Sequence, residues 1–114
     1  MENCIFCKIA AGEIPSTKVY EDDRVLAFRD LEPQAPVHIL IIPKKHYASI
    51  LDIPCDATSP LPAMAAAAQK IAQEQGIAQS GFRLVINTGK DGGQSVQHLH
   101  MHLLGGREFG WPAG

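Results

Sequence analysis

The sequence predicts an α+β fold with a mainly antiparallel sheet of five strands, one short helix and one long helix. The order of the patterns predicts it, because a short helix and three strands precede a long helix and two more strands. Composition agrees, because 46% hydrophobic and 19% charged residues are typical of globular proteins. At 114 residues the chain has room for one core, so we expect a single domain over residues 1–114.

The first half of the chain predicts one short helix and three strands. Asn3 is a suitable N-cap for a helix over residues 4–11. Residues 17–21 and 24–29, rich in β-branched and aromatic side chains, predict two strands joined by a tight turn. Residues 37–42 are almost all apolar, which predicts a strand covered on both faces.

The second half predicts the long helix and the remaining two strands. A helix is expected from Ser59, as its cap, to Gly76, because apolar residues recur there at helical spacing. A strand over 82–88, a glycine-rich loop over 89–97 and a strand over 98–104 follow. Five strands leave two sheet edges, and a domain this small often covers one edge by forming a dimer.

Charge and composition exclude several classes of function. The formal net charge is −2 and the basic residues are scattered, so we expect no nucleic-acid partner. No apolar run is long enough to span a bilayer, and the first residues lack the pattern of a signal peptide. We therefore expect a cytoplasmic protein without membrane contacts. Three cysteines in that compartment do not indicate a disulfide framework.

Three histidines alternate with apolar residues near the C-terminus. His98, His100 and His102 would share one face of a strand, and the intervening apolar residues would share the other. One histidine alone would suggest a solvated or hydrogen-bonded residue without a function. Three in register indicate a functional site, and we expect their face to line that site rather than to be buried.

With this motif the chain resembles the histidine triad family, whose signature is His-φ-His-φ-His-φ-φ with φ apolar; residues 98–104 match it completely. Further segments match in the same order: Phe28-Arg29-Asp30, Gln34-Ala35-Pro36, Ile42-Pro43-Lys44-Lys45-His46, Val85-Ile86-Asn87, Gly92-Gly93-Gln94-Ser95 and Trp111-Pro112. The resemblance implies a HIT-like fold, a homodimer, and hydrolysis at the α-phosphorus of a purine nucleotide. It is closest to the phosphoramidase branch, whose substrates are phosphoramidates such as AMP linked to an amine or to lysine.

Three alternatives remain open at this point. One is a zinc-stabilised module without turnover, although the complete triad speaks against it. The chain could hydrolyse dinucleoside polyphosphates, as a related branch of the family does, although the terminal Trp111-Pro112 favours the phosphoramidases. It could also be a nucleotide-binding interaction protein whose hydrolysis is incidental.

The resemblance also implies the roles of the three histidines. His100 would be the nucleophile, because a neutral imidazole attacks well near pH 7 and forms a nucleotidyl intermediate. His102 would donate to a phosphate oxygen, and His98 would orient its neighbours. This chemistry requires no metal cofactor.

The resemblance assigns the nucleoside to residues in the first third of the chain. Ile14, Phe28 and Leu31 would form an apolar slot for the base. Asp30 would accept hydrogen bonds from the ribose hydroxyls. Without the resemblance to the family, a residue that caps a turn would be almost as good an interpretation of Asp30.

The phosphate would be bound by residues near the triad. Glycines such as Gly93 let backbone amides approach a phosphate closely, and Ser95 adds a hydroxyl. Gln94 lies in the same loop, and Asn87 resembles a contact to the α-phosphate or leaving group. An ordinary turn is the alternative for each glycine and for Asn87.

Two cysteines in the first predicted helix, Cys4 and Cys7, have a spacing that suggests a zinc site or redox chemistry. Similar family members complete a zinc site with the residues that correspond here to His46 and His98. A structural zinc on these four ligands is therefore possible, and two small buried residues are the alternative. Cys55 is expected to be unpaired in a loop, and residue His38 to be a hydrogen-bonded core histidine rather than a ligand.

Overall fold

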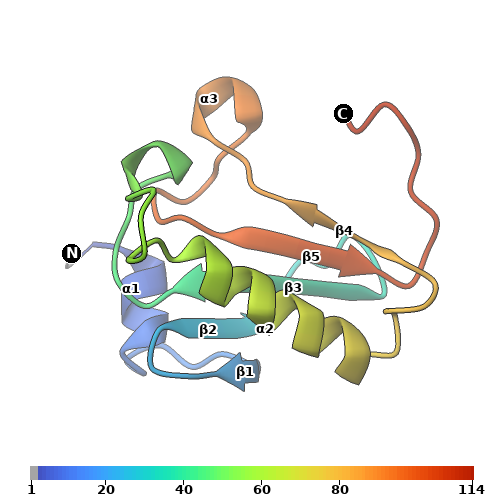
Figure 1. The fold of residues 1–114 in the computed structure, drawn as a ribbon, viewed down its shortest axis with the longest axis horizontal. Helices are drawn as coiled ribbons and strands as arrows, with labels where there is room; N and C mark the ends of the chain where they lie inside the picture. The colour runs from blue at the N-terminus through green and yellow to red at the C-terminus, as the bar shows by residue number, and fades with distance from the viewer. Residues whose placement is uncertain (1–2) are drawn as a thin grey trace.

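The computed structural model, which describes residues 3–114, contains one five-stranded sheet (Figure 1). The strand order is β1-β2-β3-β5-β4, and every neighbouring pair is antiparallel. The strands are β1 (Lys18–Glu21), β2 (Val25–Arg29), β3 (Val37–Pro43), β4 (Phe82–Val85) and β5 (Met101–Gly105). The predicted α+β fold with a five-stranded antiparallel sheet is confirmed.

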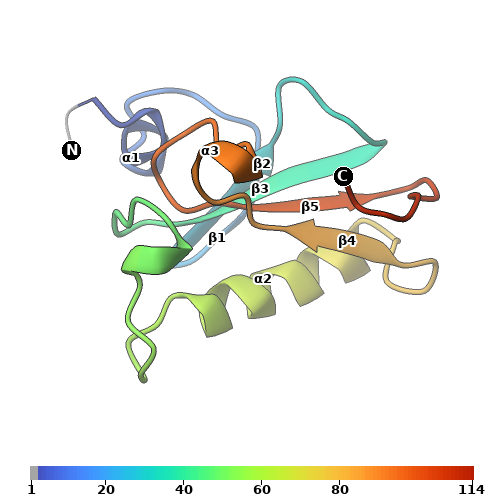
Figure 2. The ribbon, with the colours of Figure 1, turned by 90° about the horizontal axis from the view of Figure 1, so that it is seen from above.

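Two helices lie on opposite faces of this sheet (Figure 2). They are the short α1 (Ile5–Ala10) and the long α2 (Leu61–Glu74), and both were predicted. A 3-10 helix (Ile50–Asp52) and α3 (Gly89–Gly92) are additional. Between residues 3 and 114, no helix combines the length and the apolar character needed to cross a membrane.

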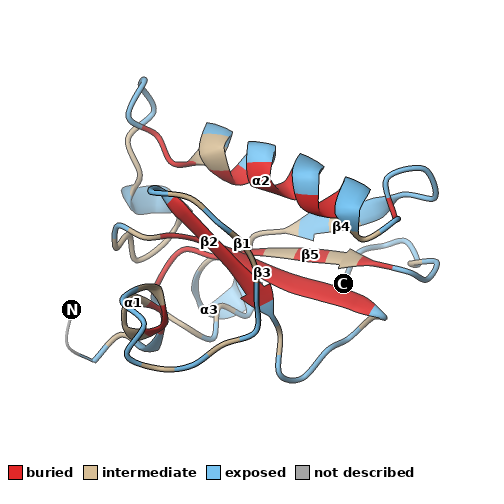
Figure 3. Cartoon of the chain, turned by 90° about the horizontal axis from the view of Figure 1, so that it is seen from below, coloured by how far each residue is buried: buried red, intermediate tan, exposed pale blue. Residues whose placement is uncertain are grey.

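The central strands separate two hydrophobic cores, because their side chains alternate between faces. Ile39 and Ile41 of β3 pack in the core under α2, whereas Leu40 and Ile42 pack with Phe6 of α1. All seven residues of β3 are buried, as the apolar run predicted (Figure 3). The face on which α1 lies carries the histidines.

Several predicted boundaries differ from the structure. The strand predicted from His98 begins at Met101, because Leu99 donates its N–H to the carbonyl of Tyr47 (2.7 Å) outside the sheet. The strand predicted to reach residue 88 ends at Val85, where its pairing with β5 ends. Helix α2 begins two residues after Ser59, whose hydroxyl still accepts from its first backbone N–H.

The loop predicted over residues 89–97 contains the single helical turn α3. Gly93 ends this turn with φ +77°, in the left-handed region that glycine adopts without strain. Helix α3 turns the chain back toward the histidines (Figure 1).

Candidate active site

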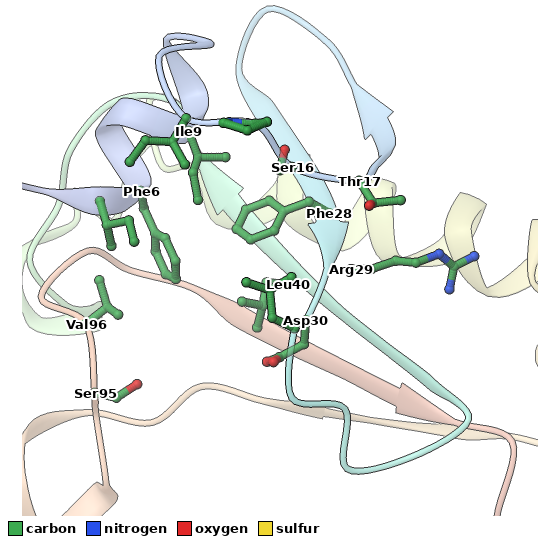
Figure 4. Close-up of a pocket in the computed structure, with 14 residues that line it drawn as sticks. Phe6, Ile9, Ser16, Thr17, Phe28, Arg29, Asp30, Leu40, Ser95 and Val96 are labelled. Atoms are coloured by element: carbon green, nitrogen blue, oxygen red, sulfur yellow. The ribbon is translucent and has the colours of Figure 1, made fainter.

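A pocket of about 270 Å³ lies between α1 and the sheet face formed by β2 and β3. Its wall is apolar, with Phe6 and Ile9 from α1, Phe28 from β2 and Leu40 from β3 (Figure 4). Asp30 and Ser95 place oxygen atoms at its margin. An apolar slot with a few polar groups at one end is suited to a planar base attached to a polar sugar.

The structure brings only some of the predicted nucleotide-binding residues to this pocket. Five of the eight line it: Ile14, Phe28, Asp30, Leu31 and Ser95. The other three lie outside its wall: Asn87, Gly93 and Gln94.

The side chain of Gln94 makes hydrogen bonds within the protein. Its Oε1 accepts the N–H of Gly89 (3.0 Å), and its Nε2 donates to the carbonyls of Ala48 (2.7 Å) and Val96 (3.0 Å). These bonds use both ends of the amide, so Gln94 fixes the loop between α3 and β5.

Asp30 has the turn-capping role that sequence reasoning held as an alternative. Its Oδ1 accepts the N–H of Glu32 (2.8 Å), and its Oδ2 lies 3.4 Å from His38 Nε2. The carboxylate still borders the pocket, so the cap does not conflict with the predicted contact to ribose.

Hydrogen bonding assigns the tautomer of His100. Its Nδ1 lies 2.7 Å from the carbonyl of His98, and a carbonyl can only accept, so Nδ1 carries the proton. When the ring is neutral, its free lone pair is therefore on Nε2. This is the tautomer that an imidazole nucleophile needs.

The expectation that the triad would not be buried is wrong for two of its members. His98 is 0% exposed and His100 is 3% exposed, because the ring of Phe6 packs edge-on against both. Burial is tolerated because each ring donates to a backbone carbonyl, His98 through Nε2 to Pro43 (2.8 Å). This burial also lowers the pKa of His98 below its usual value.

His38 is a hydrogen-bonded core histidine, as predicted, but it also contacts the triad. The N–H of Gln34 donates to His38 Nδ1 (3.0 Å), so the proton of a neutral His38 is on Nε2. His38 Nε2 can then donate to His102 Nδ1 at 2.9 Å. The remaining proton of His102 is consequently on its Nε2, free to act as a donor.

Asp30, His38 and His102 also converge closely enough to suggest a metal site. The hydrogen bonds argue against it. His38 Nδ1 accepts a backbone N–H and its Nε2 carries the proton, so a neutral His38 offers a metal no lone pair.

Cys4, Cys7, His46 and His98 converge at the end of α1 that is nearest the triad. His98 Nδ1 lies 3.2 Å from Cys4 Sγ, 3.5 Å from Cys7 Sγ and 3.2 Å from His46 Nδ1. Cys7 Sγ is 3.3 Å from His46 Nδ1. Tetrahedral zinc bonds to sulfur and nitrogen imply ligand separations of about 3.3–3.8 Å. The separations of 3.2–3.5 Å found here lie close to this range, so the donor set fits this ion.

The proton positions agree with a metal at these four residues. His98 donates from Nε2 to Pro43, which leaves the lone pair of Nδ1 directed at the cysteines.

Cys4, rather than Asn3 as predicted, caps α1, since its Sγ accepts the N–H of Cys7 (3.3 Å). Cys55 is exposed and unpaired, as predicted.

We expect acid to destabilise the protein through its buried neutral histidines. Burial, with His100 and His38 nearby, lowers the pKa of His102 to about 4, and burial also lowers that of His38. At pH values between the pKa of about 6.5 in the unfolded chain and these lower pKa values, the unfolded chain binds more protons than the folded chain does. The free energy of unfolding should therefore fall as the pH drops through this range.

Urea unfolding at about pH 7 and about pH 4.5 measures this change. His102→Asn, which removes one such group, should lose less stability over the same range. An equal loss in both proteins would contradict the assignment.

Sequence reasoning missed two features of the site. It did not place Ile5, Phe6 and Ile9 of α1 in the pocket wall, although their spacing marks one face of a helix. It also missed the contact from His38 to His102, which are 64 positions apart in sequence. The face alternation of β3 could have placed His38 on the histidine side of the sheet.

Comparison with known proteins shows similarity over almost the whole chain. Residues 11–109 match the family model described as HIT domain. The chain is 52% identical to the purine nucleoside phosphoramidase of Escherichia coli K12 over 96% of this chain and 92% of that protein. A HIT family hydrolase from Legionella pneumophila Philadelphia 1 superimposes with a TM-score of 0.94 and 55% identity, covering 98% of this chain and 100% of the other. A histidine triad protein from Clostridium difficile superimposes with a TM-score of 0.93 and 57% identity, covering 96% of each chain.

Proposed function

Because this chain belongs to the HIT domain family, we propose that it is an enzyme that hydrolyses purine nucleoside 5′-phosphoramidates to the nucleoside monophosphate. The observation that carries the proposal is the hydrogen bond from His100 Nδ1–H to the carbonyl of His98. It leaves Nε2 of a neutral imidazole as the nucleophile. The E. coli relative is named for the same reaction, which supports the proposal.

His100 Nε2 would attack the α-phosphorus and displace the amine in the first step. The P–N bond to the leaving group breaks as the P–Nε2 bond forms, which gives a nucleotidyl-histidine. The ring gains positive charge as it bonds to phosphorus, and the carbonyl of His98 stabilises that charge through Nδ1–H. Water then attacks phosphorus and breaks the P–Nε2 bond, which releases the nucleoside monophosphate and restores the neutral ring. The proton that water loses in this step balances the proton that the departing amine takes up in the first.

His102 would supply the hydrogen bond to a phosphate oxygen. His38 donates a hydrogen bond to Nδ1 of His102, so the only proton of neutral His102 is on Nε2 and is available to the substrate. The departing amine must be protonated, which favours a P–N bond because an amine accepts a proton readily. His98 would act as a positioning residue, through its carbonyl to His100.

The pocket would bind the nucleoside. Ile14, Phe28 and Leu31 are assigned to the base and Asp30 to the ribose hydroxyls, all at the pocket wall. Ser95 and the backbone near Gly93 are assigned to the phosphate, with Gln94 holding that loop. Asn87 remains assigned to the α-phosphate or leaving group on the family resemblance alone.

Steady-state hydrolysis of a small substrate panel tests the proposed function. Adenosine and guanosine phosphoramidates should be cleaved with a higher kcat/KM than diadenosine polyphosphates. The reverse order would favour the polyphosphate hydrolase. Tight nucleotide binding without turnover of any compound would favour the interaction protein.

A structural zinc bound by Cys4, Cys7, His46 and His98 is part of the proposal. The separations of the donor atoms support it, as does the lone pair on His98 Nδ1. Four protein ligands leave no open position for a water molecule, so the ion would stabilise the fold and take no part in the chemistry.

The free thiols also support a cytoplasmic location, where cysteines stay reduced.

A homodimer is also proposed, with β4 as the interface edge. Phe82 and Leu84 of β4 are 37% and 42% exposed, whereas the opposite edge strand carries an ion pair between Lys18 and Glu21. An apolar edge suits pairing, and charged residues protect the other edge.

Sedimentation should find a dimer at micromolar concentration, and Leu84→Asp should shift the protein to a monomer. Leu51→Asp, at an exposed leucine in the 3-10 helix outside the sheet, should leave the dimer intact. A wild-type protein that sediments as a monomer would refute this assembly.

A further inference from the structure

The short helix α1 belongs to two sites at once. Cys4 caps the helix and Cys7 lies in its first turn, and both thiols belong to the candidate zinc site. The same helix supplies Ile5, Phe6 and Ile9 to the wall of the nucleoside pocket. Any shift of α1 therefore changes both sites.

Two buried side chains and two thiols hold α1 against the sheet. Within the described chain, the backbone hydrogen bonds that residues 4–14 make outside the helix ladder are all local, such as Glu13 N–H to the carbonyl of Lys8. Only Phe6 and Ile9 of the helix are buried. Its side-chain polar contacts to the rest of the protein are those of the two thiols with His46 and His98. A helix of six residues is not stable alone, so its position depends on these contacts.

The other side of the candidate zinc site is held firmly without a metal. His98 donates to the carbonyl of Pro43, and Leu99 donates to the carbonyl of Tyr47. The backbone that presents the His98 carbonyl to His100 is thus anchored by the sheet and its flanking loop. Metal loss should consequently move α1 more than it moves the nucleophile.

We propose that metal binding by Cys4, Cys7, His46 and His98 is coupled through α1 to nucleoside binding, so that each ligand raises the affinity for the other. This inference rests on the proposed nucleotide substrate and zinc site. The metal fixes the helix, and the fixed helix presents Phe6 and Ile9 to the base. A nucleoside packed on these side chains holds the thiols in place in turn, as linkage requires.

Calorimetric titration with AMP tests the coupling in the full-length protein. AMP should bind about tenfold more weakly after the metal is stripped, within the usual range of coupling between two sites, and added zinc should restore it. Competition with a chromophoric chelator should show zinc held more tightly by the same factor when AMP is present. Cys55→Ser, at an exposed thiol outside both sites, should show the same coupling as wild type.

Phe6→Leu provides the test if stripping the metal unfolds the protein. It should keep the zinc content, weaken AMP binding and reduce the effect of AMP on zinc affinity. AMP and zinc affinities that are independent of each other in folded wild-type protein would overturn the proposal. Zinc content and phosphoramidate hydrolysis, measured on the same preparations, would show separately whether the proposed metal and the proposed activity hold.

Discussion

Replacing His100 with Asn should lower kcat for a purine nucleoside phosphoramidate by on the order of 10³-fold or more, with little change in AMP affinity. Asparagine can still donate an N–H near the His98 carbonyl but offers no nucleophilic nitrogen. The intermediate cannot form on it, so the loss should fall on kcat rather than on binding. Single-turnover kinetics and AMP titration on one preparation separate the two effects.

The wild-type protein provides the positive result that completes this test. A slowly hydrolysed substrate should leave a nucleotidyl group on the peptide that contains His100, and mass spectrometry should locate it there. His100→Asn should carry no label. Turnover that survives unchanged in the variant would end the proposed mechanism.

The double substitution Cys4→Ser and Cys7→Ser should remove zinc and lower the melting temperature by about 10 °C, which corresponds to roughly 2 kcal/mol for a chain of this size. The two thiolates are half of the ligand set, and hydroxyls bind zinc poorly. Elemental analysis should find one zinc per wild-type chain and none in the variant. At saturating substrate, kcat should largely survive, because the hydrogen bonds to Pro43 and Tyr47 hold the backbone beside His100 without the metal.

The matched control is Cys55→Ser, whose thiol is exposed and lies outside the candidate zinc site. It should keep both the zinc and the melting temperature. The proposal fails if wild-type protein purified without chelator contains no zinc and the double variant keeps the wild-type melting temperature. Cys4 and Cys7 would then be small packed residues that bind no metal.

Local patterns in the sequence predicted the features that depend on local rules. The apolar run of β3 predicted burial on both faces, and the alternation of the triad placed its apolar partners in the core under α2. Leu99, Met101 and Leu103 all pack there. The extent of the last strand was not predicted, because it depends on Tyr47 as a hydrogen-bond partner far away in sequence.

Long-range contacts explain the rest of what sequence reasoning missed. His38 reads as a core residue in its own strand, and only the register of β3 against β5 brings it beside His102. The Cys-x-x-Cys spacing predicted a metal site but gave no sign that the residues between and after the thiols line a pocket. Gln94 was assigned to the nucleotide on resemblance, whereas its amide bonds to three backbone groups.

These three bonds of Gln94 have a consequence for the entropy of binding. A glycine-rich loop samples many backbone conformations, and ordering it around a phosphate would cost part of the binding free energy. The amide bridges Gly89, Ala48 and Val96, so the loop is already ordered before a ligand arrives. The glycines can thus allow close approach to a phosphate without the flexibility that would otherwise weaken its binding.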